Sequence, residues 1–375
     1  MPHSPFRTLA VIAASAGVAY LGFALHRVRR FGKRAHANAE NLPSVSILKP
    51  LHGEEAELYE NLRSFCTQEY PDFEVILGVR AAGDPALGVA QRVAEEFGDR
   101  VRLVTGERAP ATRNPKVANL AGMLELARNE LIVIADADMR VGPEYLRRIV
   151  TPFTDPAVGA VTCLYAGSPR SGIASSLGAM FINEQFAPSV LVAGALEPLR
   201  YCFGATIAVK RAVLERIGGF AALGEHVADD HLLGKLVTDA GMRIVLSDYV
   251  VENVVSEPEF ATLWSRELRW SRTIRSVRPL GHAFSFMTFG LPLAAVAALI
   301  APRSALLFGA AIVLRLALHQ EANAALGVPR AGSALLIPLR DALSVAVWLT
   351  AFLDRAVDWR GQRLELDSQG DILAG

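Results

Sequence analysis

The sequence predicts an α/β fold with a mostly parallel sheet, together with apolar helices near both ends. Short apolar runs alternate with segments of ten or so residues that have helical spacing, a pattern typical of βαβ units. The run LIVIA at Leu131–Ala135 has the composition of a strand buried on both faces. Long uncharged stretches lie near the start of the chain and in its last third.

The elements follow in order. The expected strands of the first half are Ser44–Lys49, Phe73–Val79, Val101–Val104 and Leu131–Ala135. The expected helices between and after them are Glu55–Thr67, Ala86–Phe97, Lys116–Ala127 and Pro143–Val150. The second half is less regular, with expected strands at Val158–Leu164, Phe203–Val209 and Met242–Leu246 and a basic helix at Glu259–Arg278.

Composition and missing motifs exclude several function classes. The 375 residues carry a formal net charge of zero, so there is no global electrostatic case for a nucleic-acid partner. The GxGxxG, GxxxxGK[ST] and GxSxG motifs are absent, which counts against dinucleotide oxidoreductases, P-loop nucleotidases and α/β-hydrolases. The cysteines Cys66, Cys163 and Cys202 have no CxxC spacing, and we expect buried thiols in a reducing compartment.

The segment Leu9–Leu25 contains no charge and is long enough to span a bilayer. A basic cluster follows it at residues 27–34, whereas Arg7 alone precedes it. This asymmetry places the chain after the segment in the cytoplasm. A cleaved signal peptide has its basic cluster before the apolar run, so we expect residues 8–26 to be an uncleaved transmembrane anchor.

Three further apolar segments occupy about Ala283–Pro302, Ala305–Leu318 and Ala334–Leu353. Arg315, Arg340 and Asp341 lie within them, and ionisable groups at membrane depth usually face a bundle interior or a cavity. One segment is alternatively a re-entrant or interfacial helix, so the span count stays at three to four. The expected domains are an anchor at 8–26, a catalytic domain at 42–280 ending in the basic helix, membrane helices at 283–354 and a polar tail at 355–375.

Asp136 and Asp138 directly follow the strand Leu131–Ala135. Ligands of open α/β sheets bind at the carboxyl ends of the strands, and extended residues two apart point the same way. Magnesium and manganese prefer such carboxylates and often share them with substrate phosphates. The motif therefore predicts a metal–diphosphate site, with a helix cap or a solvated turn as the alternative.

Two later motifs also have two interpretations. Asp229 and Asp230 open a helix, where acidic residues complement the helix dipole; a zinc site with the nearby histidines is disfavoured because these residues do not share one face. The arginines of Glu259–Arg278 fit an amphipathic helix on an anionic membrane face. Clustered arginines also clamp phosphates.

The order of these motifs resembles a known family. Asp84, then Asp136 and Asp138, then Asp229-Asp230 and finally Arg266-x-x-Arg269-Trp270 resemble the D…D…D…(Q/R)xxRW signature of family 2-like inverting glycosyltransferases. Lys49-Pro50-Leu51, Asp84-Pro85-Ala86, Asn114-Pro115-Lys116-Val117-x-Asn119-Leu120 and Trp359-Arg360-x-x-Arg363 are similar to the ceramide glucosyltransferase branch. Lys49–Cys66 and Glu267–Arg275 look most like bacterial hopanoid biosynthesis-associated glycosyltransferases.

The resemblance implies a GT-A fold, a UDP-sugar donor, a lipid hydroxyl acceptor and inversion at the anomeric carbon. It implies that Asp230 is the general base and that Asp136 and Asp138 hold Mg²⁺ or Mn²⁺ on the diphosphate. Asp84 is expected at the uracil or ribose. The other expected donor-site residues are Lys49, Lys116, Asn119, Arg266, Arg269 and Trp270.

The expected acceptor is a hopanoid of the bacteriohopanetetrol type, glycosylated with N-acetylglucosamine or glucose, at the cytoplasmic face of a bacterial inner membrane. A ceramide acceptor is the alternative, although the acceptor-side histidine stretch of ceramide enzymes has no clear match around Phe181–Leu191. A processive polysaccharide synthase and a non-catalytic scaffold are the rivals. The apolar segment Ser171–Leu191 is either an acceptor-side lid or ordinary core.

Overall fold

The structure is a computed structural model that describes residues 5–34, 42–108, 112–170, 172–329, 331–354, 356–359, 362–367 and 370–373. The chain forms two compact units. The first comprises Met1–Arg34, Ala166–Glu197 and Val255–Gly375, and the second comprises Ala35–Tyr165 and Pro198–Val254. Ser171 and Arg360, which belong to segments singled out above, lie outside the described residues.

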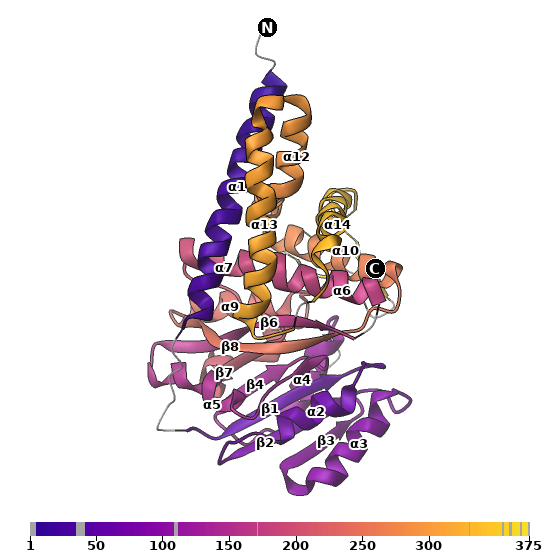
Figure 1. The fold of residues 1–375 in the computed structure, drawn as a ribbon. Helices are drawn as coiled ribbons and strands as arrows, with labels where there is room; N and C mark the ends of the chain where they lie inside the picture. Colours follow the sequence, from indigo (N-terminus) through magenta and orange to yellow (C-terminus); the bar gives the residue numbers. More distant parts are fainter. Residues whose placement is uncertain are drawn as a thin grey trace. The chain divides into compact units, whose positions relative to one another are not determined.

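The described residues form a sheet of eight strands in the order β3-β2-β1-β4-β7-β6-β8-β5 (Figure 1). The strands are β1 (Val45–Leu51), β2 (Phe73–Val79), β3 (Val101–Thr105), β4 (Leu131–Ala135), β5 (Met139–Arg140), β6 (Val158–Pro169), β7 (Thr206–Lys210) and β8 (Arg243–Val255). Strands β1 to β4 pair in parallel, whereas β7 runs antiparallel to both β4 and β6. The predicted α/β class is confirmed, with a parallel half extended by antiparallel strands.

Helices cover both faces of the parallel half, which explains why its strands are continuous apolar runs. Ile47, Val75 and Val133 belong to one core cluster, whereas Leu48, Ile76 and Ile132 belong to another. The alternation follows the two-residue period of a strand. The helices of this unit are α2 (Leu58–Cys66), α3 (Ala86–Phe97), α4 (Pro115–Leu124), α5 (Tyr145–Val150), α8 (Arg211–Arg216) and α9 (Asp229–Asp239).

The sequence missed β5 and underestimated the lengths of β6 and β8. Asp136-Ala137-Asp138 forms a tight turn after β4, in which the Met139 amide donates to the Asp136 carbonyl at 3.3 Å. The two residues of β5 then pair antiparallel with β8. Such pairing is decided by a partner more than a hundred residues away, so a local pattern cannot reveal it.

The first unit is mainly helical, with a small antiparallel sheet of β9 (Val357–Trp359) and β10 (Gln362–Leu364) among its described residues. Its helices are α1 (Pro5–Gly32), α6 (Gly172–Phe181), α7 (Ala187–Leu196), α10 (Phe260–Val277), α11 (Pro279–Phe284), α12 (Gly290–Ile300), α13 (Ala305–Leu326) and α14 (Ile337–Thr350), with a π-helix at Ile182–Phe186 between α6 and α7. Helix α1 packs against α12 and α13 (Figure 1). The contact with α12 is close, because a Cβ at Gly17 would lie 2.7 Å from the Cα of Gly290, as expected where small residues let helices approach.

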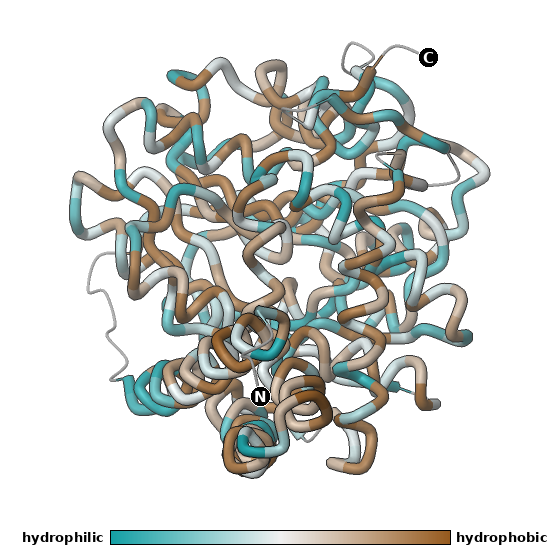
Figure 2. The backbone as a smooth tube through the Cα atoms, turned by 90° about the horizontal axis from the view of Figure 1, so that it is seen from above, coloured by the Kyte–Doolittle hydropathy of each residue, from teal (hydrophilic) through white to brown (hydrophobic). Residues whose placement is uncertain are grey.

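Within the described residues, three helices are long and apolar enough to cross a membrane: Pro5–Gly32, Gly172–Leu196 and Pro302–Leu326. The pair Pro279–Thr288 and Gly290–Ile300, bent by 63°, is a fourth candidate if it counts as one span. Hydrophobic residues are dense in the helices beside the N-terminus (Figure 2). The segment Ala334–Leu353 forms the shorter α14. Gly172–Leu196, which overlaps the segment predicted to be an acceptor-side lid or ordinary core, has the length of a span.

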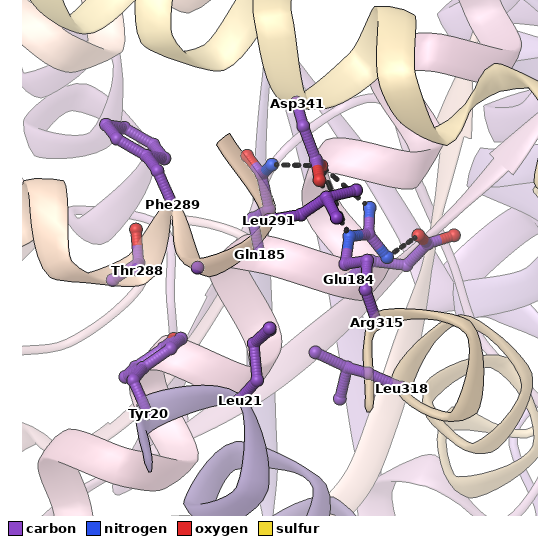
Figure 3. A pocket seen from close by; sticks show the side chains of 11 residues that line it. Tyr20, Leu21, Glu184, Gln185, Thr288, Phe289, Leu291, Arg315, Leu318 and Asp341 are labelled. Atoms are coloured by element: carbon purple, nitrogen blue, oxygen red, sulfur yellow. Dashed lines mark hydrogen bonds and ion pairs between the residues drawn. The ribbon is translucent and has the colours of Figure 1, made fainter. Parts of the chain in front are cut away.

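The ionisable residues of the apolar C-terminal segments face the interior of this unit. Arg315 is 3% exposed and Asp341 is 5% exposed. The Arg315 guanidinium lies between the carboxylates of Asp341 and Glu184, with the shortest contacts at 3.0 and 2.7 Å (Figure 3). Glu184 also contacts Nδ1 of His319 at 2.7 Å. Charges buried in this way require partners, and here carboxylates from two segments supply them.

Candidate active site

Polar residues gather at one edge of the sheet in the second unit, where β4 ends and the antiparallel β7 begins. Asp136 follows the carboxyl end of β4, and Ala135 pairs with Thr206, the first residue of the antiparallel β7. Gly204 therefore lies beside Asp136. Asp230, in the first turn of α9, reaches the same place, because its Oδ2 accepts a hydrogen bond from the Gly204 amide at 2.8 Å.

Gly204 marks the point where three charged side chains converge. A Cβ built on this glycine would lie 3.2 Å from Asp136 Oδ2, 3.4 Å from Asp230 Oδ2 and 3.5 Å from Lys116 Nζ. Segments far apart in the sequence, around residues 116, 136, 204 and 230, thus meet at one point. A side chain at position 204 would occupy the space that these groups surround.

Lys116 is the central cation of this cluster. Its Nζ lies 2.8 Å from Asp136 Oδ1 and 3.7 Å from Asp229 Oδ2. Burial alone lowers the pKa of a lysine, but the attraction of Asp136 and Asp229 outweighs it, so the pKa of Lys116 is raised. Lys116 therefore stays protonated and is suited to hold anionic oxygens.

The two acidic residues in the first turn of α9, Asp229 and Asp230, have raised pKa values. Burial is the main cause for both, and Lys116 opposes it. The pKa of Asp229 rises to about 6, with the neighbouring Asp230 contributing. The pKa of Asp230 is also raised, although its carboxylate accepts hydrogen bonds from the amides of His231 and Gly204. A buried carboxylate of this kind is a better proton acceptor than an exposed aspartate.

Asn114 positions Lys116 at the start of α4. The Asn114 Oδ1 accepts hydrogen bonds from the amides of Lys116 and Val117 at 2.9 and 3.1 Å, which is a side-chain N-cap. Its Nδ2 donates to the His226 carbonyl at 2.8 Å, three residues before Asp229. Pro115 occupies the first helical position, where its missing amide costs nothing. One fully buried side chain thus joins the starts of α4 and α9.

We expect N114A to destabilise the protein by about 1–3 kcal/mol, because it removes a helix cap and the donor that Asn114 Nδ2 offers to the half-buried His226 carbonyl. Chemical denaturation of the purified chain measures this loss. Asn114→Asp is the matched control: it keeps the cap acceptor and loses only the donor, so its loss should be smaller. Equal stability of N114A and the unmodified chain would contradict the capping role.

The predicted metal ligands fit a divalent cation that substrate oxygens help to hold. The Asp136 side chain is 34% exposed, and Asp138 Oδ2 accepts a hydrogen bond from Asn253 Nδ2 at 2.7 Å. Among the described residues, His, Cys, Asp and Glu side chains form no group of three that could hold a metal alone. Magnesium-type sites commonly use one or two carboxylates and complete the shell with phosphate and water, which is the donor set available here.

Two predicted donor-site residues, Lys49 and Asn119, make their contacts within the second unit. Lys49 is fully buried, donates to the Asp136 carbonyl and lies 3.9 Å from the centroid of the Phe65 ring. Burial lowers its pKa to about 7, against the opposing effect of Asp138 and Asp136. Asn119 donates to the Gly78 carbonyl at 2.9 Å. Both side chains therefore hold backbone segments of the site in place.

Asp84 joins the loops that follow β1 and β2. Its Oδ1 accepts hydrogen bonds from the amides of Gly53 and Ala86, each at 2.9 Å. Its Oδ2 lies 3.1 Å from His52 Nδ1. These contacts fix the shape of the loops at the carboxyl ends of two neighbouring parallel strands, where ligands bind in such sheets.

The predicted residues of the basic helix belong to the first unit, on α10. Arg266 forms an ion pair with Glu257, and its guanidinium carbon lies 4.8 Å from the Trp270 ring centroid. Trp270 in turn stacks on Phe181 at 6.0 Å. Arg269 lies on the same helix. The Arg-x-x-Arg-Trp motif is therefore held by ionic and aromatic contacts within its own unit.

Sequence reasoning missed Gly204, Asn253 and the capping role of Asn114. A single glycine before an apolar strand gives no signal by itself, and the Asn253–Asp138 contact depends on the β5–β8 pairing. Asn114 is the first residue of the Asn114–Leu120 motif, and its position directly before Pro-Lys at a helix start is a recognisable cap signal.

The chain is similar to known proteins over most of its length. Residues 9–372 match Glycosyl transferase family 21. Ceramide glucosyltransferase 1 of Caenorhabditis elegans is 26% identical over 250 residues, which are 66% of this chain and 53% of that protein. Beta-monoglucosyldiacylglycerol synthase of Trichormus variabilis is 26% identical over 267 residues, 68% of this chain and 53% of that protein. The chain thus spans about half the length of these relatives.

A solved structure shares the fold. The mannosyltransferase PcManGT from Pyrobaculum calidifontis, determined with GDP-Man and Mn²⁺, superposes with a TM-score of 0.59 and 21% identity, over 93% of this chain and 98% of that chain. The expected GT-A-type fold is confirmed by this likeness. Because the family match extends over nearly the whole sequence, the chain belongs to glycosyl transferase family 21.

Proposed function

We propose that this protein is an inverting glycosyltransferase that moves a sugar from a UDP-sugar to a hydroxyl group of a membrane lipid. The observation that carries the proposal is the convergence of Asp136, Asp230 and Lys116 around Gly204. It brings a proton acceptor, a protonated amine and a metal-type carboxylate together, which are the groups that this reaction requires.

In the proposed reaction the acceptor oxygen attacks the anomeric carbon while Asp230 takes the hydroxyl proton. The bond between the anomeric carbon and the diphosphate breaks, and UDP leaves with the electron pair. Lys116 stabilises the negative charge that grows on the diphosphate. Asp84 holds the uracil or ribose at the loops after β1 and β2, and Arg266, Arg269 and Trp270 contribute to the donor site.

A divalent cation held by Asp136 and Asp138 would add positive charge at the leaving diphosphate. Lys49 and Asn119 act indirectly in this scheme. Lys49 holds the backbone carbonyl of Asp136, and Asn119 fixes α4, the helix of Lys116, against β2. The manganese bound by the mannosyltransferase that shares the fold is consistent with Mn²⁺ or Mg²⁺ here.

The apolar helices support a membrane location, with residues 8–26 as an anchor and 283–354 as further membrane-embedded helices. The basic residues at 27–34 favour a catalytic domain at 42–280 on the cytoplasmic face, which in a bacterium is that of the inner membrane. A soluble dianionic donor and a bilayer-dissolved acceptor can then meet at the headgroup plane.

The acceptor that we propose first is a hopanoid polyol, because Lys49–Cys66 and Glu267–Arg275 resemble hopanoid-associated transferases, with N-acetylglucosamine or glucose as the sugar. The relatives favour two other candidates, a ceramide and a diacylglycerol, since one relative is a ceramide glucosyltransferase and another a monoglucosyldiacylglycerol synthase. Mass spectrometry of total lipids from cells with and without this chain tests all three. A new glycolipid identifies the acceptor, and an unchanged lipid profile with every donor supplied counts against the function.

We expect G204A to lower transfer at least tenfold while the protein stays folded. The added methyl group would meet the ends of Asp136, Asp230 and Lys116 at 3.2–3.5 Å, and these flexible ends can shift without moving the backbone. Initial rates and a thermal melt of the same preparation measure the two effects. G88A is the matched control, because a Cβ on Gly88 meets nothing within 4 Å. A G204A rate equal to that of G88A would contradict the proposed site.

A further inference from the structure

Arg340 is among the largest fully buried side chains in the described part of the chain, although it lies on a helix expected from sequence to be apolar. Its guanidinium forms a two-pronged pair with Glu267, with Nη1 at 2.6 Å from Oε1 and Nη2 at 2.7 Å from Oε2. The Glu267 side chain is 1% exposed. Such a fork is directional as well as strong, so it fixes the rotation of the helix that carries the carboxylate.

The helix that carries Glu267 is α10, and Glu267 stands between Arg266 and Arg269 in the motif. The remaining Arg340 donors extend the connection. Nη1 also donates to the Leu177 carbonyl of α6 at 3.0 Å, and Nη2 donates to Ser344 Oγ at 3.0 Å. One buried guanidinium therefore ties α10 to both α6 and α14.

Arg340 also contacts the aromatic stack of the motif. Its guanidinium carbon lies 5.5 Å from the centroid of Phe181, and Phe181 stacks on Trp270 with an interplanar angle of 27°. The Arg266 guanidinium in turn lies over the Trp270 ring. Arg340 thus reaches the motif by two routes, through the Glu267 carboxylate and through the Phe181 ring.

The pair is anchored in the interior of the apolar helices. Ser344 donates to Gln185 Oε1 at 2.6 Å, and Gln185 Nε2 donates to Asp341 at 3.4 Å. Asp341 holds Arg315 (Figure 3). The position of α10 is therefore set by a polar network that continues into the π-helix and α13, where a displaced charge would be left without a partner.

We propose that Arg340 is a positioning residue for the reaction: it orients the Arg266–Trp270 segment through Glu267 and Phe181, without contacting the substrates. This assignment rests on the proposed function in one respect: it takes the Arg266–Trp270 segment to bind the sugar donor. A lysine at position 340 keeps the charge but loses the fork, so R340K leaves Glu267 paired and allows α10 to rotate.

The test compares R340K with the unmodified chain by kcat for glycolipid formation and by the ¹⁹F resonance of 5-fluorotryptophan at position 270, assigned with W270F. We expect at least a tenfold lower kcat and a shifted or broadened resonance. E267M/R340M removes both charges, so neither is left buried without its partner if a single variant misfolds. It should show the same two effects. The control is R148M/D248M, which removes the ion pair between the buried Arg148 and the half-buried Asp248 of the other unit, with contacts of 3.1 and 2.9 Å. It should change neither.

Folded R340K with an unchanged Trp270 resonance would overturn the proposal, whatever its rate. A shifted resonance with unchanged kcat would also overturn it, because the orientation would then not matter to the reaction. Failure of the proposed function is a separate result: the unmodified chain then forms no glycolipid with any donor, and the resonance alone decides whether Arg340 orients the motif.

Discussion

Asp230→Asn should lower the rate of transfer by about 10²–10⁴-fold, the range that a positioned general base contributes. The amide has nearly the same shape and can still accept the hydrogen bond from the Gly204 amide, but it cannot take the acceptor proton. The loss should therefore appear in kcat. Donor affinity should change little, since Lys116 and Asp136 remain. Steady-state kinetics together with UDP titration by calorimetry measure both quantities.

The neighbouring Asp229 gives the matched control for D230N. Asp229 Oδ2 lies 3.7 Å from Lys116 Nζ, and the pKa of Asp229 is raised. In the proposed reaction, however, Asp230 takes the acceptor proton and Asp229 does not. We expect D229N to be affected less than D230N, because it perturbs the charge around Lys116 and leaves the base in place. D230N with the turnover of the unmodified chain would remove Asp230 from the role, and a D229N rate far below that of D230N would transfer the role to its neighbour.

Removal of divalent cations should abolish turnover, and Mn²⁺ or Mg²⁺ should restore it. The charge on the departing diphosphate would otherwise be balanced by Lys116 and the donor-site arginines alone. Titration of cation into chelator-treated protein measures the dependence. D138N should require a higher cation concentration for half of the maximal rate, because a neutral amide is a poorer ligand than a carboxylate.

The control for D138N is D155N, since Asp155 pairs with Arg243 on an exposed part of the second unit. It should leave the cation requirement unchanged. Full activity in excess chelator would contradict the assignment of Asp136 and Asp138 as metal ligands. An equal cation requirement for D138N and the unmodified chain would exclude Asp138 alone.

The parallel half of the fold was predictable because its strands are short apolar runs between polar turns. Phe73–Val79 and Leu131–Ala135 form strands with the predicted limits, since both faces of each are covered by helices. The antiparallel half was harder to predict from the sequence. Strand β8 extends to Val255 through Ser247, Asp248 and Glu252, where apolar periodicity is weak and pairing with other strands decides the conformation.

The site was predictable where a motif lies at a strand end, as with Asp136, or opens a helix, as with Asp230. Their convergence on Gly204 was not, because it depends on β7 entering the sheet antiparallel next to β4. Lys49 shows the limit of motif reasoning: the resemblance predicts it at the donor site, but no motif indicates that its fully buried side chain donates to the Asp136 carbonyl. The Arg340–Glu267 pair joins residues 73 positions apart, and no local pattern indicates such a partner.

Transfer of labelled sugar by the purified chain shows whether this protein glycosylates a membrane lipid. The chain is incubated with Mn²⁺, a UDP-sugar carrying label in the sugar and vesicles that contain the candidate lipids, and the label is then partitioned between organic and aqueous phases. The proposed function predicts label in the organic phase, and its appearance there should require both the lipid and Asp230. Label that stays in the aqueous phase as polymer or unreacted donor, with each candidate donor and lipid, would contradict it.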